Sequence, residues 1–112
     1  MPDPLSWLVA FALTQLIEVP ILAAWARDRP WPARIAIAFG ASAITHPILW
    51  FVIRPLLAPI SYPAYVVIGE LFAVLVEAYY LRRLGVRDAL LASVSANAAS
   101  WLFGRLLLAL LA

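Results

Sequence analysis

Three glutamates lie within apolar stretches of this 112-residue chain: Glu18 in the first stretch, and Glu70 and Glu77 in the third. Seven residues make almost two turns of an α-helix, so Glu70 and Glu77 fall within roughly 20° of each other on one stripe. An ionisable side chain near the centre of a membrane helix costs about 2.5 to 3.5 kcal/mol, so such residues usually face a bundle interior and mark a site. The acids therefore predict where the function resides, without naming a substrate.

The composition is that of an integral membrane protein. The chain is 66% hydrophobic and 12% charged, whereas a soluble domain has about 25% charged residues. A hydrocarbon core of about 30 Å takes about 20 helical residues per crossing, so the chain has room for four crossings. We expect an all-α integral membrane bundle of four transmembrane helices, forming a single domain over residues 1–112, with helices at about 5–26, 34–53, 62–82 and 88–111.

The remaining composition excludes several functions. The chain has no cysteine, so disulfides, thiolate metal sites and a cysteine nucleophile are excluded. The net charge of +2 comes from arginines in the expected loops, and we therefore expect no nucleic-acid partner. The expected partners are the lipid bilayer and either further copies of this chain, in a homo-oligomer, or other membrane subunits.

Arginine placement predicts the orientation in the membrane. The loops 27–34 and 82–88 fall on one side, and the other side carries only Arg54 and Arg105. The side with more arginines faces the cytoplasm, so we expect both loops there and both termini outside, in a bacterial inner membrane. The six arginines of the expected cytoplasmic side are Arg27, Arg29, Arg34, Arg82, Arg83 and Arg87.

The sequence also contains a weak internal repeat. Residues 15–18, Gln-Leu-Ile-Glu, match residues 74–77, Val-Leu-Val-Glu, and residues 41–45 match residues 96–100. Two tandem helical hairpins in the same orientation would produce this pattern, although a chain so rich in alanine can also match itself by chance. In the last helix, small residues recur every fourth position, which predicts a close packing ridge: Ala92, Ala96, Ser100 and Gly104.

Counting about 1.5 Å of helix rise per residue sorts the polar side chains into two tiers. The inner tier comprises Glu18, Glu77 and Asn97, and the outer tier comprises His46, Glu70 and Ser100, with Thr14 and Thr45 close by. These two tiers contain the six residues that we predict to form a substrate or ion-binding site. Packing between helices is the simpler explanation for the presence of Asn97 and Ser100 within the membrane segments.

The apolar segments hold no arginine or lysine to neutralise the acids, unless Arg105 reaches down from the outer face. The acids must then hold protons, a cation or a cationic substrate. We expect at least one of Glu18 and Glu77 to be protonated at neutral pH, or a cation to lie between them. His46 is expected to bond to Glu70 or to relay protons between the tiers. Pro47 follows His46 directly and would free a backbone carbonyl, or merely bend its helix.

Three functions agree with this pattern. The favoured one is a transporter or channel that moves protons, a cation or a cationic solute. The first alternative is a non-catalytic subunit or assembly factor of a larger membrane complex, whose polar residues join helices. The second alternative is an intramembrane metalloenzyme, although one chain offers a single histidine, His46, beside the glutamates. We predict no cofactor apart from a cation at Glu18 and Glu77, the identity of any metal is open, and no residue is assigned to catalysis.

Overall fold

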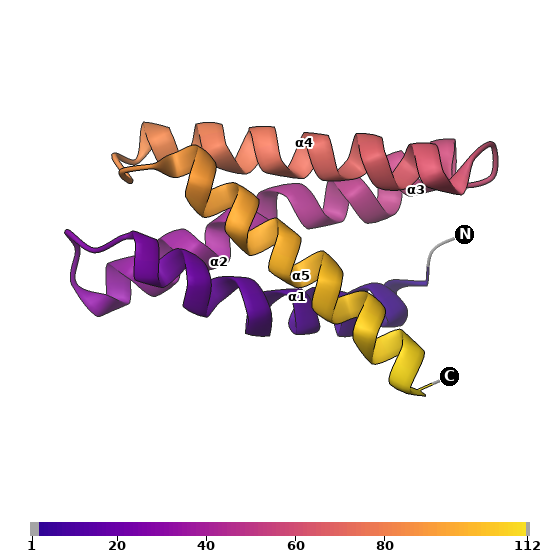
Figure 1. Cartoon of the computed structure of the whole chain (residues 1–112), viewed down its shortest axis with the longest axis horizontal. Coiled ribbons are helices and arrows are strands. Elements are labelled where there is room, and N and C mark those ends of the chain that lie inside the picture. The colour runs from indigo at the N-terminus through magenta and orange to yellow at the C-terminus, as the bar shows by residue number, and fades with distance from the viewer. Residues whose placement is uncertain (1–2, 112) are drawn as a thin grey trace.

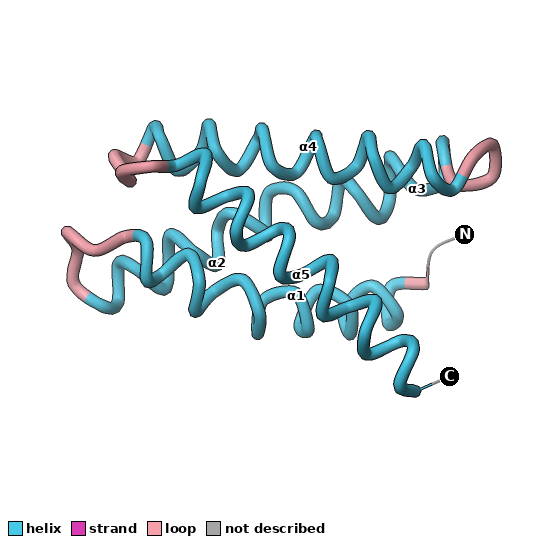
Figure 2. The backbone as a smooth tube through the Cα atoms, in the orientation of Figure 1, coloured by secondary structure: helices cyan, strands magenta, loops and turns pink. Residues whose placement is uncertain are grey.

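The computed structural model describes residues 3–111, which form long helices and no strand. The expected all-α architecture of four helices is therefore confirmed. Its elements are α1 (Pro4–Trp25), α2 (Trp31–Ile48), the π-helical turn η1 (Leu49–Ile53), α3 (Arg54–Leu57), α4 (Tyr62–Arg83) and α5 (Ala89–Leu111). The segments α2, η1 and α3 follow one another without a break, so together they form the second of the four helices (Figure 2).

The helices have the length and composition of membrane spans. Among the described residues, three are long and apolar enough to cross a bilayer: Pro4–Trp25, Trp31–Leu57 and Tyr62–Arg83. The fourth, α5, has 23 residues, which at about 1.5 Å per residue is the length of one crossing. Large apolar side chains are exposed along these helices, as expected for a surface that meets lipid.

The second helix is longer at both ends than its sequence predicts. It begins at Trp31, because Pro32 lies in its first turn, where a missing N–H leaves no helical hydrogen bond unmade. It also continues past Arg54 to Leu57, because η1 widens the helix so that the N–H of Arg54 bonds to the carbonyl of Leu49, five residues earlier. Proline at position 55 is thereby accommodated in the first turn of α3.

The four helices form two hairpins with the same orientation. Figure 1 shows α1 and α4 running in one direction, with α2 and α5 returning in the other and crossing between them. Each hairpin packs internally, α1 on α2 and α4 on α5, and the hairpins join through α1 with α5 and α2 with α4. The start of α1 and the end of α5 lie at one end of the bundle, and the loops after α1 and α4 lie at the other (Figures 1 and 2). This arrangement matches the expected tandem parallel hairpins.

The densest core lies toward the two loops. Leu22 of α1 and Leu81 of α4 are each 1% exposed, and small side chains of α2 and α5 pack against them. In α5 the predicted ridge is only partly used, because Ala92 and Ala96 are fully buried but a Cβ added at Gly104 would meet nothing within 4 Å. The hairpins therefore pack closely at the loop end of the bundle, and α5 leaves the core toward its C-terminal end, whereas α4 stays in contact with η1 and α3.

Candidate functional site

Glu18 and Glu77 meet in the interior of the bundle. Each lies on a buried stripe whose residues recur every three or four positions in α1 and every four in α4, so Glu18 and Glu77 lie inside the bundle at exposures of 3% and 2%. The two side chains line one cavity and lie close enough for their charges to interact. Two carboxylates at such a distance repel each other, so a proton or a cation shared between them stabilises the pair.

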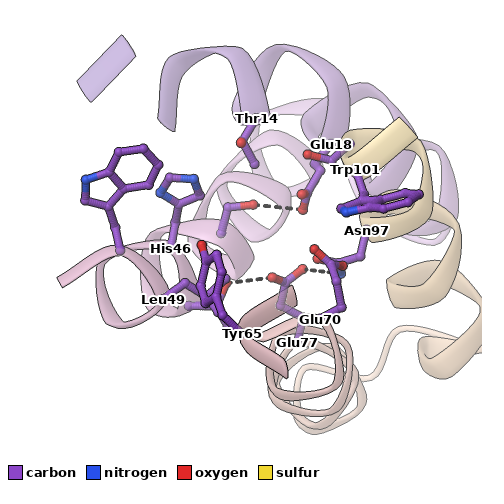
Figure 3. A pocket seen from close by; sticks show the side chains of 13 residues that line it. Thr14, Glu18, His46, Leu49, Tyr65, Glu70, Glu77, Asn97 and Trp101 are labelled. Atoms are coloured by element: carbon purple, nitrogen blue, oxygen red, sulfur yellow. Dashed lines mark hydrogen bonds between the residues drawn. The ribbon is translucent and has the colours of Figure 1, made fainter. Parts of the chain in front are cut away.

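Small polar side chains of α2 and α5 hold the two carboxyl groups. Ser42 Oγ donates to Glu18 Oε1 at 2.9 Å, and Thr45 Oγ1 donates to Glu77 Oε2 at 2.6 Å (Figure 3). Asn97 Nδ2 donates to Glu77 Oε1 at 3.1 Å. The Asn97 amide group is itself positioned by a second bond, from Nδ2 to the backbone carbonyl of Ser93 at 2.9 Å. Glu77 and Asn97 of the expected inner tier are therefore joined by a hydrogen bond, whereas the hydrogen bond to Glu18 comes from Ser42.

A cavity of about 140 Å³ lies beside these acids, on the side of the termini. A water molecule needs about 10 to 15 Å³ of such space, so the cavity has room for several waters or a small cation. On the side of the loops, Leu22 and Leu81 follow one turn after the glutamates and are fully buried, which closes the interior there. The cavity is lined by Thr14, Glu18, Ser42, Thr45, His46, Leu49, Trp50, Tyr65, Glu70, Glu77, Asn97, Ser100 and Trp101 (Figure 3).

All six residues that the sequence singled out line this cavity, but the outer tier is not a unit. Ser100 lines the cavity together with Glu18 of the inner tier. Glu70 lines the cavity on the same stripe of α4 as Glu77 and is half-buried. Sequence reasoning did not include Ser42 in the site, although the Ala41-Ser42-x-x-Thr45 pattern places both hydroxyls on one helix face.

His46 does not have the environment that the sequence suggested. Its ring lies among aromatic rings, with centroids 6.0 Å from that of Trp50 and 5.5 Å from that of Phe11. Its Nδ1 atom is buried and has no hydrogen-bonding partner in the described structure. The expected bond between His46 and Glu70 is therefore not made through Nδ1, because neighbouring aromatic side chains of α1 and η1 surround the imidazole instead.

No arginine lines the described cavity. The guanidinium group of Arg105 lies 5.0 Å from the centroid of the Trp101 ring, and that of Arg54 lies 4.4 Å from the centroid of the Trp50 ring. Stacking on a tryptophan ring stabilises a guanidinium group where it is. Arg105 is therefore held against Trp101 in the C-terminal half of α5 and does not line the cavity with the buried acids.

The two hairpins supply equivalent halves of the site. In the internal repeat, residues 15–18 match residues 74–77, so that Glu18 is the equivalent of Glu77. The match between residues 41–45 and 96–100 makes Ser42 the equivalent of Asn97. The contacts follow the same equivalence, because Ser42 and Asn97 each donate to the glutamate of their own hairpin. The internal repeat that the sequence only suggested thus agrees with the geometry of the site.

The equivalence extends to contacts between the hairpins. Thr45 and Ser100 are also equivalent positions of the repeat, since each ends its matched segment. Thr45 donates to Glu77 of the other hairpin, and Ser100 lines the same cavity as Glu18 of the other hairpin. Glu77 therefore has one hydrogen-bonding partner from each hairpin, so that its full set of bonds is made only when the hairpins are packed together.

Some features of the site are unlike those of a metalloenzyme. Across the part of the chain that the structure describes, no three His, Cys, Asp or Glu side chains are grouped closely enough to hold a metal ion. Catalytic zinc in proteins is usually held by three such ligands.

Comparison of the chain with models of protein families, with curated proteins and with solved structures finds no match. The function must therefore be argued from the site itself.

Proposed function

We propose that this protein is a small transporter or channel that moves protons, a cation or a cationic solute across the membrane. The observation that carries the proposal is the pair Glu18 and Glu77, which meet beside a cavity inside helices long enough to span a bilayer. Buried acids of membrane helices usually line ion pathways or proton relays. The pair is the binding and protonation site of this proposal, with Glu70 on the path between it and the outer end of the bundle.

Access to the pair supports this assignment. The cavity reaches from the glutamates toward the end with the termini, where Tyr65 and Trp101 line it. On the other side, the buried Leu22 and Leu81 separate the glutamates from the loops. An alternating pathway needs a site that is open to one side and closed to the other. Opening of the apolar core that contains Leu22 and Leu81 would give the same two carboxyl groups access to the opposite side.

The test is flux through the purified protein in lipid vesicles. Proton movement is followed with an enclosed pH-sensitive dye, and cation movement with isotopes or cation-sensitive dyes. Glu18→Gln and Glu77→Gln keep the shape of the side chain and remove its charge, so each is expected to reduce flux at least about tenfold. Asp88→Asn, in the loop after α4 and outside both cavities, is the control and is expected to leave flux unchanged. Unchanged flux in both glutamate variants, each correctly folded, would refute the proposal.

We further propose the orientation that the arginines predict, with the loops after α1 and α4 in the cytoplasm of a bacterial cell. Both loops lie at the same end of the bundle, which supports a single orientation for all their arginines (Figure 1). Because the chain has no cysteine, single cysteines introduced at residue 28 or at residue 60 can be labelled from one side of intact cells. Labelling of residue 60, but not residue 28, from outside is expected.

A second candidate function is that of a non-catalytic subunit or assembly factor. It is favoured by the hydrogen bonds themselves, since Ser42, Thr45 and Asn97 give both glutamates intramolecular partners that would also serve to hold helices together. The exposed apolar surface would then meet other subunits, or further copies of the chain in a homo-oligomer, as well as lipid. Purification of a stable partner from native membranes, together with an absence of flux in vesicles, would favour this function.

A further inference from the structure

A second cavity, of about 260 Å³, lies at the opposite end of the bundle from the first. It is lined by Trp25, Arg27 and Asp28, at the end of α1 and in the loop that follows, and by Arg87 from the loop after α4. It shares no lining residue with the cavity beside the glutamates. The proposed transport function makes no use of it, so its ligand has to be inferred from its own side chains.

The two loops that form this cavity are fixed by the fold. Ala26 and Val86, one from each loop, are buried in the same apolar core. The guanidinium group of Arg34 donates to the backbone carbonyl of Arg27 at 2.6 Å and to that of Arg29 at 3.0 Å. The backbone of the loop after α1 is already held in place. A ligand that binds between the loops therefore does not have to order it, and binding costs little conformational entropy.

The side chains are suited to a phosphate ester. Guanidinium groups present paired N–H donors that match phosphate oxygens, and this cavity has two, Arg27 and Arg87. With the carboxylate of Asp28, the formal charge of the lining is +1, from two arginines and one aspartate. A phosphodiester carries one negative charge and balances this lining, whereas a phosphate monoester carries more.

The position of the cavity indicates where the phosphodiester comes from. Trp25 is the last residue of α1, a helix long enough to span the membrane, and tryptophan at such a position lies at the level of the lipid head groups. The guanidinium group of Arg27 lies 5.9 Å from the centroid of the Trp25 ring, so the cavity is at the same level. We propose that this cavity binds the phosphodiester of an anionic phospholipid between Arg27 and Arg87.

The experiment measures lipid binding by the full-length protein in neutral detergent micelles. Short-chain phosphatidylglycerol is titrated by calorimetry, and its adducts are counted by native mass spectrometry. We expect Arg27→Gln and Arg87→Gln each to weaken binding about tenfold or more, because each loses a charged hydrogen bond to phosphate. Arg83→Gln, at the same end but outside the cavity, removes the same charge and is expected to change the affinity by less than about twofold.

Two further ligands and one further variant distinguish a specific lipid site from binding of the free head group and from attraction to diffuse surface charge. Glycerophosphoglycerol has the same head group without acyl chains, and phosphatidylcholine has a phosphodiester without net charge; both are expected to bind at least about tenfold more weakly. Asp28→Asn leaves both arginines in place and is expected to tighten binding of phosphatidylglycerol. An equal loss in Arg83→Gln would overturn the proposal in favour of diffuse surface charge, and tight binding of the deacylated head group would overturn the assignment to lipid.

Discussion

The short hydrogen bond between Thr45 and Glu77 can be removed with little change of shape. Thr45→Val replaces the hydroxyl group by a methyl group, and Thr45 is buried at 1% exposure. The variant loses the 2.6 Å bond to Glu77 Oε2 and a weaker one, at 3.3 Å, to the carbonyl of Ala41. Hydrogen bonds between membrane helices contribute about 0.6 kcal/mol on average, and bonds to charged groups contribute about 1.5 to 3 kcal/mol.

The expected loss is therefore about 1 to 2 kcal/mol in the free energy of unfolding, measured by reversible unfolding in mixed micelles. A double-mutant cycle with Glu77→Gln should assign most of this loss to the pair. Ser95→Ala is the matched control, because Ser95 donates to a backbone carbonyl of its own helix at 2.7 Å and contacts no acid. A Thr45→Val variant as stable as the native protein, or one whose loss is not coupled to position 77, would refute the geometry described for the site.

Three further outcomes follow from the fold. A Cβ added at Gly40 would overlap the hydroxyl group of Tyr80, so Gly40→Ala should lower the free energy of unfolding by about 1 to 3 kcal/mol, and Tyr80→Phe should rescue it. At Gly85, where φ is +81°, Gly85→Ala should cost about 1 kcal/mol in the same assay. Hydrogen bonds from the side chain and backbone of Ser6 hold the pKa of Asp3 below its ordinary value of 3.8, so Asp3→Ala should destabilise the protein at neutral pH.

The effect at Asp3 has a definite pH dependence. Because the pKa of this carboxyl group is lower in the folded than in the unfolded protein, the stabilisation is complete above the unfolded value and fades as the pH falls through the folded value. Unfolding curves of the native protein and of Asp3→Ala should therefore converge in acid and separate toward neutral pH. A difference that is constant across this range would show that the cap does not depend on the carboxylate charge.

The sequence predicts the helices and the burial of the acids because hydropathy and helix period act locally. Glu18 and Glu77 could be assigned to the interior from their apolar surroundings alone. The extension of the second helix past position 55 could not be predicted, because it depends on a π-helical turn whose sequence, Leu-Trp-Phe-Val-Ile, has no distinctive signal. The same holds for the aromatic environment of His46, which is formed by side chains of two helices.

The hydrogen-bonding partners of the two glutamates could be predicted from the sequence only in part. Depth along a helix placed Asn97 beside Glu77 correctly, but depth does not specify which way a helix faces. Ser42 and Thr45 are assigned to the site only by the packing of α2 against α1 and α4. The internal repeat, which matched only a few residues in an alanine-rich sequence, becomes convincing because equivalent residues make equivalent hydrogen bonds.

The central claim is that Glu18 and Glu77 form one site. It is tested most directly by comparing flux in vesicles for Glu18→Gln, Glu77→Gln and the double variant. If one proton or cation is shared by the two carboxyl groups, either substitution alone abolishes the site, so the three variants should lose flux to the same extent. Losses that multiply in the double variant would show two independent sites and would contradict the account.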